Sequence, residues 1–250
     1  DVPEAWGGLG ADPRFSFVIV DVMSRRGYAG FVGGLQVHND IIPSYLLHCG
    51  TEEQKQYWLP KMVSGEVVAA IGMTEPGAGS DLKNIRTVAR REGDEYVVNG
   101  SKIFISNGQH ADLVVLAATT DRGAGSRGGS LFLVDTRTPG LTRGRNLEKV
   151  GQHAADTSEL FFDDMRIPAS ALLGEEGKGF AMMMQELPRE RMIVGIQALG
   201  LAKGARDLAV RYVPEREAFG QPLAKLQNTR FTLAEAETAI AACEAFANAC

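Results

Sequence analysis

Two stretches of the sequence bring together residue types that could do chemistry, and the first of them is rich in glycine. It reads Met73-Thr74-Glu75-Pro76-Gly77-Ala78-Gly79-Ser80-Asp81, with a hydroxyl near each end. Gly77 and Gly79 allow a backbone to come close to a flat or anionic ligand, and successive N–H groups can form an anion-binding nest. The spacing is not a dinucleotide fingerprint, because Leu82 stands where the third glycine belongs. Taken alone, the segment predicts a ligand-binding turn or an ordinary tight turn.

Acidic and basic side chains alternate in the second stretch, Glu186-Leu187-Pro188-Arg189-Glu190-Arg191. Glu186 and Glu190 are four residues apart and therefore share one face of a helix. A carboxylate in a dry pocket has a raised pKa and can act as a general base. The alternative is a solvated surface cluster in which each carboxylate pairs with a neighbouring arginine, as in most charge runs.

A further segment, Arg216-Glu217-Ala218-Phe219-Gly220, is followed closely by Gln227 and has groups suited to a nucleotide. Arg216 offers a planar fork that matches a pyrophosphate, and Gln227 can both donate and accept hydrogen bonds. Phe219 can stack on an adenine. The alternative is the end of a helix, with Arg216 favourable to the helix dipole and Gly220 just past the last turn.

The middle of the sequence has the period-two pattern of β-strands. Strands are predicted at 95–99, 102–106, 113–118, 130–135 and 159–165. Gly93-Asp94 and Asn99-Gly100 are turn signals, and the second predicts a hairpin. Many short strands without intervening helices predict an antiparallel barrel or sandwich. The segment 121–129 is rich in Gly, Arg and Ser and predicts an exposed loop.

Helical periodicity flanks this region on both sides. A helix is expected to begin after Thr51 and to run to about Met62, because a hydroxyl that can cap the helix is followed by two acidic residues. Towards the other end, 180–213 predicts one long helical segment notched at Pro188, and another helix begins near Leu223. The whole pattern predicts an α+β fold of helices, then strands, then helices.

Composition and charge exclude several classes of protein. A chain of 250 residues with 44% hydrophobic residues can bury a sizeable core in two or more packed units. The net charge of −5 argues against nucleic acid as the main partner, and no apolar run is long enough to span a bilayer. Three distant cysteines predict a reducing compartment without a disulfide framework or zinc site, and the four histidines show no metal-ligand spacing.

The two ends of the sequence predict a piece of a longer protein. It starts without an initiator Met or a signal-peptide pattern, and it stops within the helical pattern 232–250. The predicted domains are a partial N-terminal helical domain (1–66), a middle β domain (67–173) and a partial C-terminal helical bundle (174–250). The richness in Ala, Gly and Arg favours a bacterial cytoplasm, with a mitochondrial matrix as the alternative.

The glycine-rich segment and the later run Phe104-Ile105-Ser106-Asn107-Gly108 resemble the signature of the acyl-CoA dehydrogenase family. The resemblance implies a cofactor, FAD, whose isoalloxazine is hydrogen-bonded by the first segment and covered by the second. The FAD contacts that it implies here are Ile71, Met73, Thr74, Gly79, Ser80, Phe104, Ile105 and Ser106. The family often has Trp at the position of Phe104, and Phe keeps the apolar face but loses the indole donor.

The segment around Phe219 resembles the part of this family that clamps FAD across a subunit boundary. The resemblance adds Arg216, Phe219 and Gln227 to the FAD contacts. It also implies a homo-oligomer, at least a dimer and by the family's pattern a tetramer.

The run 184–191 is similar to the long-chain branch of the family, which carries its catalytic base at the position of Glu190. Glu190 would remove the α-proton of a medium- or long-chain acyl-CoA while a hydride passes from the β-carbon to the flavin, giving the trans-2-enoyl-CoA of fatty acid β-oxidation. The electrons would then pass to an electron-transferring flavoprotein. The implied substrate contacts are Ser80, Arg127, Pro188, Arg189 and Arg191.

Three other functions remain open at this point. The isovaleryl-type dehydrogenases for branched chains also carry a glutamate on this helix. A flavin oxidase or hydroxylase could use the same scaffold, and a relative that only binds acyl-CoA and FAD would need no base. Arg127 fits a solvated loop arginine equally well, and the methionines at 182–184 suit core packing as well as an acyl tunnel.

Overall fold

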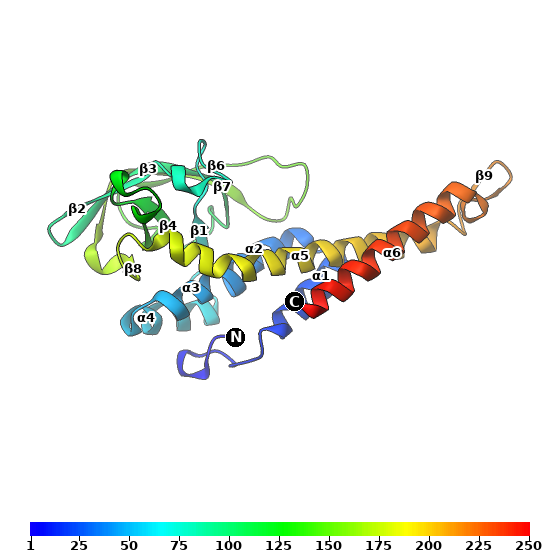
Figure 1. Ribbon diagram of the computed structural model, residues 1–250, viewed down its shortest axis with the longest axis horizontal. Coiled ribbons are helices and arrows are strands. Elements are labelled where there is room, and N and C mark those ends of the chain that lie inside the picture. The colour runs from blue at the N-terminus through cyan, green and yellow to red at the C-terminus, as the bar shows by residue number, and fades with distance from the viewer. The chain divides into compact units, whose positions relative to one another are not determined.

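The computed structural model describes residues 1–250, which divide into two compact units (Figure 1). The sheet unit comprises Asp1–Asp12 and Gly33–Glu190, and the helical unit comprises Pro13–Val32 and Arg191–Cys250. Helix α5 (Gly179–Tyr212) begins in the first unit and ends in the second. The predicted order of helices, then strands, then helices is confirmed.

Short helices make up the first quarter of the chain. They are η1 (Glu4–Trp6), α1 (Arg14–Arg25), α2 (Ala29–Gln36), the π-helical turn η2 (Val37–Ile41), α3 (Ile42–Cys49) and α4 (Glu52–Ser64). Helix α4 begins where the sequence predicts, because Thr51 Oγ1 accepts a hydrogen bond from the Gln54 amide at 3.2 Å and Gln54 Oε1 accepts one from the Thr51 amide at 3.0 Å. It ends at Gly65, which has a φ of 77° that favours glycine.

The sheet unit is built on one eight-stranded sheet. Its strands are β1 (Ala69–Gly72), β2 (Val88–Glu92), β3 (Glu95–Ser106), β4 (Leu113–Thr119), β5 (Gly129–Asp135), β6 (Leu141–Asn146), β7 (Thr157–Pro168) and β8 (Leu172–Leu173). They lie in the order β6-β7-β3-β2-β4-β5-β8, with β1 beside β4. The pairing is antiparallel except that β1 and β2 each run parallel to β4. Three short 3₁₀ segments join them: η3 (Leu82–Asn84), η4 (Arg122–Arg127) and η5 (Ala169–Ala171).

One predicted turn is wrong. Asn99-Gly100 does not close a hairpin but is a bulge inside the single long strand β3, where the register with β7 shifts between Val98 and Gly100. The Asn99 side chain exchanges hydrogen bonds with Asp164 of β7, both at 2.9 Å, which ties the bulge to the neighbouring strand. A Cβ at Gly100 would lie only 2.5 Å from Thr87 Oγ1, so glycine is required by cross-strand crowding and not by a turn.

Strand β4 explains where the core lies. Leu113, Val115 and Ala117 face α3 and α4, while the alternate residues face a second cluster on the other side of the sheet. Figure 1 shows α3 and α4 on one side of the sheet. A strand buried on both faces needs a continuous apolar run, and β4 has one. Each buried leucine or valine contributes ~1.5–3 kcal/mol to folding.

The helical unit packs α1 against the later part of α5. Glycines permit the close approach, because a Cβ at Gly200 would lie 2.7 Å from the Asp21 carbonyl and one at Gly204 would lie 2.3 Å from the Arg25 carbonyl. Lys203 Nζ then lies 2.7 Å from Asp21 Oδ1 and donates to Glu244 Oε1 at 2.9 Å. The unit is completed by β9 (Glu217–Ala218), β10 (Gln221–Pro222), η6 (Leu223–Lys225) and α6 (Gln227–Ala249).

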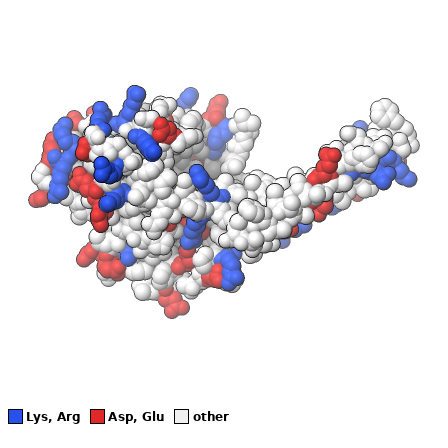
Figure 2. All heavy atoms as spheres, in the orientation of Figure 1, with Lys and Arg blue, Asp and Glu red and all other residues white.

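The surface charges are mixed in sign. On the face of the sheet unit that Figure 2 shows, Lys and Arg side chains lie among Asp and Glu side chains and form no continuous basic surface. This distribution agrees with the negative net charge. None of the helices combines the length and the apolar character needed to cross a membrane.

Candidate functional site

The glycine-rich segment forms a tight turn directly after β1. Glu75 and Ala78 exchange backbone hydrogen bonds of 2.9 and 3.1 Å, and the Thr74 carbonyl accepts one from the Ile103 amide at 2.9 Å. A Cβ added at Gly77 or Gly79 would meet no atom within 4 Å. Neither glycine is therefore needed for packing inside the chain, and the turn has open space on the side from which a ligand could approach its backbone.

A buried ion pair that sequence reasoning missed lies behind this turn. Lys102 Nζ of β3 lies 2.7 Å from Glu75 Oε1 and donates to the Met73 carbonyl at 3.0 Å, and both charged side chains are buried. The Glu75 carboxylate also accepts hydrogen bonds from the backbone amides of Arg86 and Thr87, at 2.6 and 3.0 Å. The pair therefore fastens the turn both to β3 and to the segment that leads into β2.

Burial and pairing shift the pKa of both groups. Burial lowers the pKa of Lys102 to about 8, although the charge of Glu75 opposes this change. Burial alone would raise the pKa of Glu75, but the charge of Lys102 and the hydrogen bonds that the carboxylate accepts hold this pKa below its usual value. Glu75 is thus an anion fixed by its surroundings.

Phe104 occupies an unusual place on β3, next to the turn. Its φ is 61°, in the left-handed region, and the register with β7 shifts between Lys102 and Ile105. This second bulge leaves the Phe104 side chain 63% exposed, whereas Ile105 is buried in the sheet core. A flat ligand could therefore lie against the Phe104 ring but could meet only the backbone of Ile105. Ser106 is half-buried and pairs with Thr157.

The two candidate carboxylates lie on α5 and face α3. Tyr45 donates its hydroxyl to Glu190 Oε1 at 2.8 Å, and His48 Nδ1 lies 2.7 Å from Glu186 Oε1. Glu186 is only 4% exposed, and Glu190 is half-buried. This placement excludes the alternative of a solvated surface cluster. Arg189 pairs with Asp1 at 2.6 Å.

The environment keeps Tyr45 a hydrogen-bond donor. Burial, reinforced by the charge of Glu190, raises the pKa of the Tyr45 hydroxyl far above its usual value. Burial also raises the pKa of the neighbouring Cys49 thiol, and the charge of Glu186 adds to this effect. Both groups on α3 are therefore neutral beside the carboxylates at physiological pH.

Sequence reasoning gave no role to the histidines, yet all four contact other residues, and His38 and His48 do so next to the candidate site. Besides the pair of His48 with Glu186, His38 Nδ1 accepts a hydrogen bond from the Ala69 amide at 3.2 Å, and its Nε2 lies 3.1 Å from the Met62 carbonyl. His38 thereby connects α4 to β1, the strand that leads into the glycine-rich turn.

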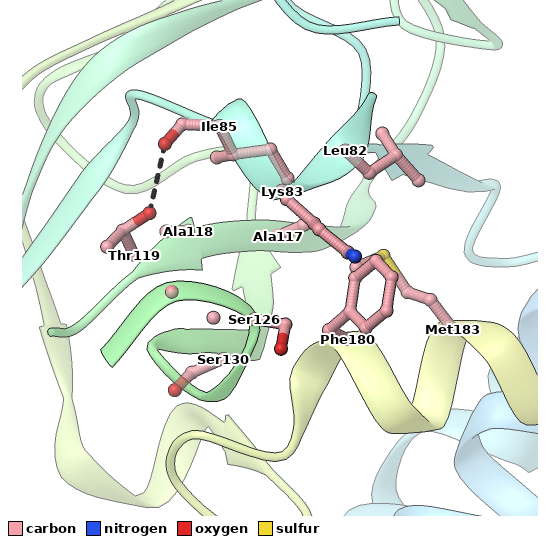
Figure 3. A pocket seen from close by; sticks show the side chains of 12 residues that line it. Leu82, Lys83, Ile85, Ala117, Ala118, Thr119, Ser126, Ser130, Phe180 and Met183 are labelled. Carbon is pink, nitrogen blue, oxygen red and sulfur yellow. Dashed lines mark hydrogen bonds between the residues drawn. The ribbon is translucent and has the colours of Figure 1, made fainter. Parts of the chain in front are cut away.

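A small cavity lies where α5 begins (Figure 3). It is lined by Leu82, Lys83, Ile85, Ala117, Ala118, Thr119, Gly125, Ser126, Gly129, Ser130, Phe180 and Met183. Phe180 and Met183 come from α5, and Lys83 Nζ lies 5.6 Å from the centre of the Phe180 ring. Arg127 is exposed on η4 beside this cavity. Of the three consecutive methionines, Met182 and Met183 are buried in the core.

Arg216, Phe219 and Gln227 belong to the helical unit and form a group of their own. Phe219 and Gly220 join β9 to β10 and both have positive φ, at 55° and 74°, as a type I′ hairpin requires. The Phe219 ring is 93% exposed at the tip of this hairpin. The alternative of a helix end at Gly220 is excluded, since α5 ends at Tyr212. Arg216 and Gln227 are exposed on either side of the hairpin.

Three domain descriptions of one protein family match the chain. They are "Acyl-CoA dehydrogenase, N-terminal domain" over residues 1–66, "middle domain" over 70–165 and "C-terminal domain" over 177–250. A solved relative, an acyl-CoA dehydrogenase from Geobacillus kaustophilus, has a TM-score of 0.95 and 51% identity, with 98% of this chain and 65% of that chain covered.

Curated relatives of different chain-length specificity match as well. The mitochondrial long-chain specific acyl-CoA dehydrogenase of Sus scrofa is 44% identical, with all of this chain and 58% of that protein covered. The mitochondrial short-chain specific acyl-CoA dehydrogenase of Rattus norvegicus is 41% identical, with 96% of this chain and 58% of that protein covered. The chain thus spans less than two thirds of the length of these relatives.

Proposed function

Because this chain belongs to the acyl-CoA dehydrogenase family, we propose that the protein containing it is an FAD-dependent enzyme that desaturates fatty acyl-CoA. The observation that carries the proposal is the half-buried Glu190 carboxylate, fixed by the hydroxyl of Tyr45 in the same unit as an open glycine-rich turn. A purely binding protein would gain nothing from holding a costly carboxylate in this way.

Glu190 is the proposed base. Its carboxylate takes a proton from the carbon next to the thioester carbonyl, and the electron pair of that C–H bond forms the new double bond as a hydride leaves the β-carbon. FAD, when bound, supplies the acceptor for that hydride. Glu186 is a poorer candidate for the base, because its carboxylate already contacts the His48 ring at 2.7 Å.

The residues of the sheet unit fit a bound flavin. The open backbone at Gly77 and Gly79 gives room for a planar ring system, and the exposed Phe104 ring offers it an apolar face. We assign the flavin contacts to Ile71, Met73, Thr74, Gly79, Ser80, Phe104, the backbone of Ile105, and Ser106. We further propose that Arg216, Phe219 and Gln227 bind the FAD of a neighbouring subunit in a homo-oligomer, because an aromatic ring exposed on a hairpin tip lacks a partner of its own.

For the substrate we propose a medium- or long-chain acyl-CoA, because the run 184–191 is similar to the long-chain branch. The branched-chain type remains the runner-up. Ser80 and Arg127 are exposed and could meet the CoA portion, while Pro188, Arg189 and Arg191 flank Glu190 on α5. The Arg189 atoms Nε and Nη2 are buried without a hydrogen-bond partner, which suits a further polar contact.

The proposed electron acceptor is an electron-transferring flavoprotein, and the proposed setting is fatty acid β-oxidation in a bacterial cytoplasm, with a mitochondrial matrix as the alternative. An anaerobic titration of the intact protein with acyl-CoAs of graded chain length tests the reaction and the chain length together. We expect the flavin absorbance to bleach with medium or long chains. A flavin that never bleaches would overturn the dehydrogenase proposal in favour of a binding protein, and rapid reoxidation by air would indicate an oxidase.

A further inference from the structure

Tyr45 on α3 contacts the proposed base but is not itself the group that takes the proton. Its side chain is fully buried, at 0% exposure, and its hydroxyl lies 2.8 Å from Glu190 Oε1 across 145 residues of sequence. We propose that Tyr45 is the positioning residue that holds the Glu190 carboxylate for proton abstraction. This inference rests on the proposed function, in which Glu190 is the base.

The packing around Tyr45 makes its hydroxyl a fixed point. The ring belongs to the core cluster that contains Ile42, Leu46 and Met182, so it has little freedom to turn. A glutamate side chain, in contrast, has several rotatable bonds and loses considerable entropy when it is held in place. A single hydrogen bond from a rigid donor therefore selects one orientation of the carboxylate among many.

A second contact, between His48 and Glu186, joins the same two helices one helical turn away. Tyr45 and His48 lie three residues apart on α3, and their partners Glu190 and Glu186 lie four residues apart on α5. The two contacts form consecutive rungs between the helices. Glu186 contacts His48, and the single O–H group of Tyr45 donates to Glu190.

The two rungs differ in chemistry. The His48 side chain is 52% exposed, so the partner of Glu186 is in contact with solvent. The Tyr45 rung is buried and its donor stays neutral. The other titratable or charged groups near this rung are the Cys49 thiol on α3 and Arg189 on α5, which is bound to Asp1.

The Tyr45 bond has two consequences for the reaction. It favours the ionised form of the carboxylate, which is the form that can accept a proton. It also orients the carboxylate, because the donor to Oε1 is fixed in the core, and the proton leaving the α-carbon forms the new O–H bond on this carboxylate. Tyr45 exchanges no proton in this step.

The test is Tyr45→Phe in the intact protein, because phenylalanine keeps the ring and removes only the hydroxyl. We expect kcat to fall about ten-fold, and the acid limb of the kcat/KM profile to move up by about one pH unit, as for a carboxylate that loses one hydrogen bond to its charged form. Infrared difference spectra provide a readout besides activity. The carboxyl band that disappears in Glu190→Gln should titrate at higher pH in Tyr45→Phe.

Tyr96→Phe is the matched control. Tyr96 is 1% exposed, with its ring in the sheet core, and it donates its hydroxyl to Glu176 at 2.8 Å. It should lose a similar amount of stability without a change in the pH profile. If Tyr45→Phe lowers only the melting temperature, as we expect of the control, the positioning role of Tyr45 is wrong. Glu190 would then still be the proposed base. If instead Glu190→Gln keeps its activity, the proposed function itself fails, whatever the result at Tyr45.

Discussion

The glycine-rich turn and the pair of rungs between α3 and α5 both contain carboxylates, but they place them differently. At the turn, the charge of Glu75 is buried against Lys102, and the surface open to a ligand consists of backbone and glycine. At the rungs, the half-buried Glu190 is held by the neutral Tyr45. The first region uses charge to hold its shape, whereas in the proposed function the second holds the carboxylate that takes up the proton. Mutations should therefore change binding and stability in the first region and reaction rate in the second.

The largest expected effect separates the two rungs. Glu190→Gln removes the proposed base, so kcat should fall by about 10²–10⁴-fold. Flavin content and melting temperature should stay close to those of the wild type, because glutamine can still accept the bond from Tyr45. Stopped-flow measurement of flavin reduction gives the rate. The control is Glu186→Gln on the same helix, and an equal loss of rate there would show that the reactive charge has been assigned to the wrong rung.

The next effect falls on the turn. Lys102→Met leaves the Glu75 carboxylate buried without its counter-charge, which should cost about 3–5 kcal/mol of unfolding free energy and release FAD. Urea unfolding and the flavin-to-protein absorbance ratio measure these two quantities. The double variant with Glu75→Gln should recover part of the stability, because no charge is then left unpaired. A single variant that unfolds like the wild type would contradict the structural role of the pair.

The structural features that could be predicted from the sequence are those that depend on local patterns. The capping box at Thr51 and the apolar run of β4 identify their elements within a few residues. The tight turn at the glycine-rich segment follows in the same way. Such signals act between neighbours in the chain, so they need no knowledge of tertiary packing.

The remaining features depend on residues that are distant in sequence. The partner of Glu75 is 27 residues away on strand β3, and the partner of Glu190 is 145 residues away on another helix. The local sequence of Asn99-Gly100 is typical of a turn. The residues on β2 and β7 that make it a bulge are distant in sequence, so the local pattern does not identify them. Lys102 did offer one signal, since a charged residue stands among the apolar residues of a predicted strand.

A pH dependence should sharpen the difference between the regions. Because burial lowers the pKa of Lys102 to about 8 in the folded protein, the unfolded chain binds more protons than the folded one between that pH and the usual lysine value. Stability supplied through Lys102 should therefore rise with pH across this window. The difference in unfolding free energy between the wild type and Lys102→Met should grow by on the order of 1–3 kcal/mol from pH 7 to pH 10. Urea unfolding of both proteins at pH 7 and pH 10 measures this difference. A difference that becomes smaller at pH 10 would contradict the prediction.

The smallest expected effect concerns the exposed aromatic rings of the two units. Phe104 and Phe219 both have positive φ, at 61° and 55°, which costs a non-glycine residue about 1 kcal/mol or more. Phe104→Gly should therefore stabilise the flavin-free protein by up to about 1 kcal/mol, in a thermal melt, while it weakens FAD binding. Phe219→Gly is the matched variant on a hairpin instead of a bulge. If the Phe104 ring covers no ligand, Phe104→Gly will leave the affinity for FAD unchanged. The strained backbone at this position would then have no functional explanation.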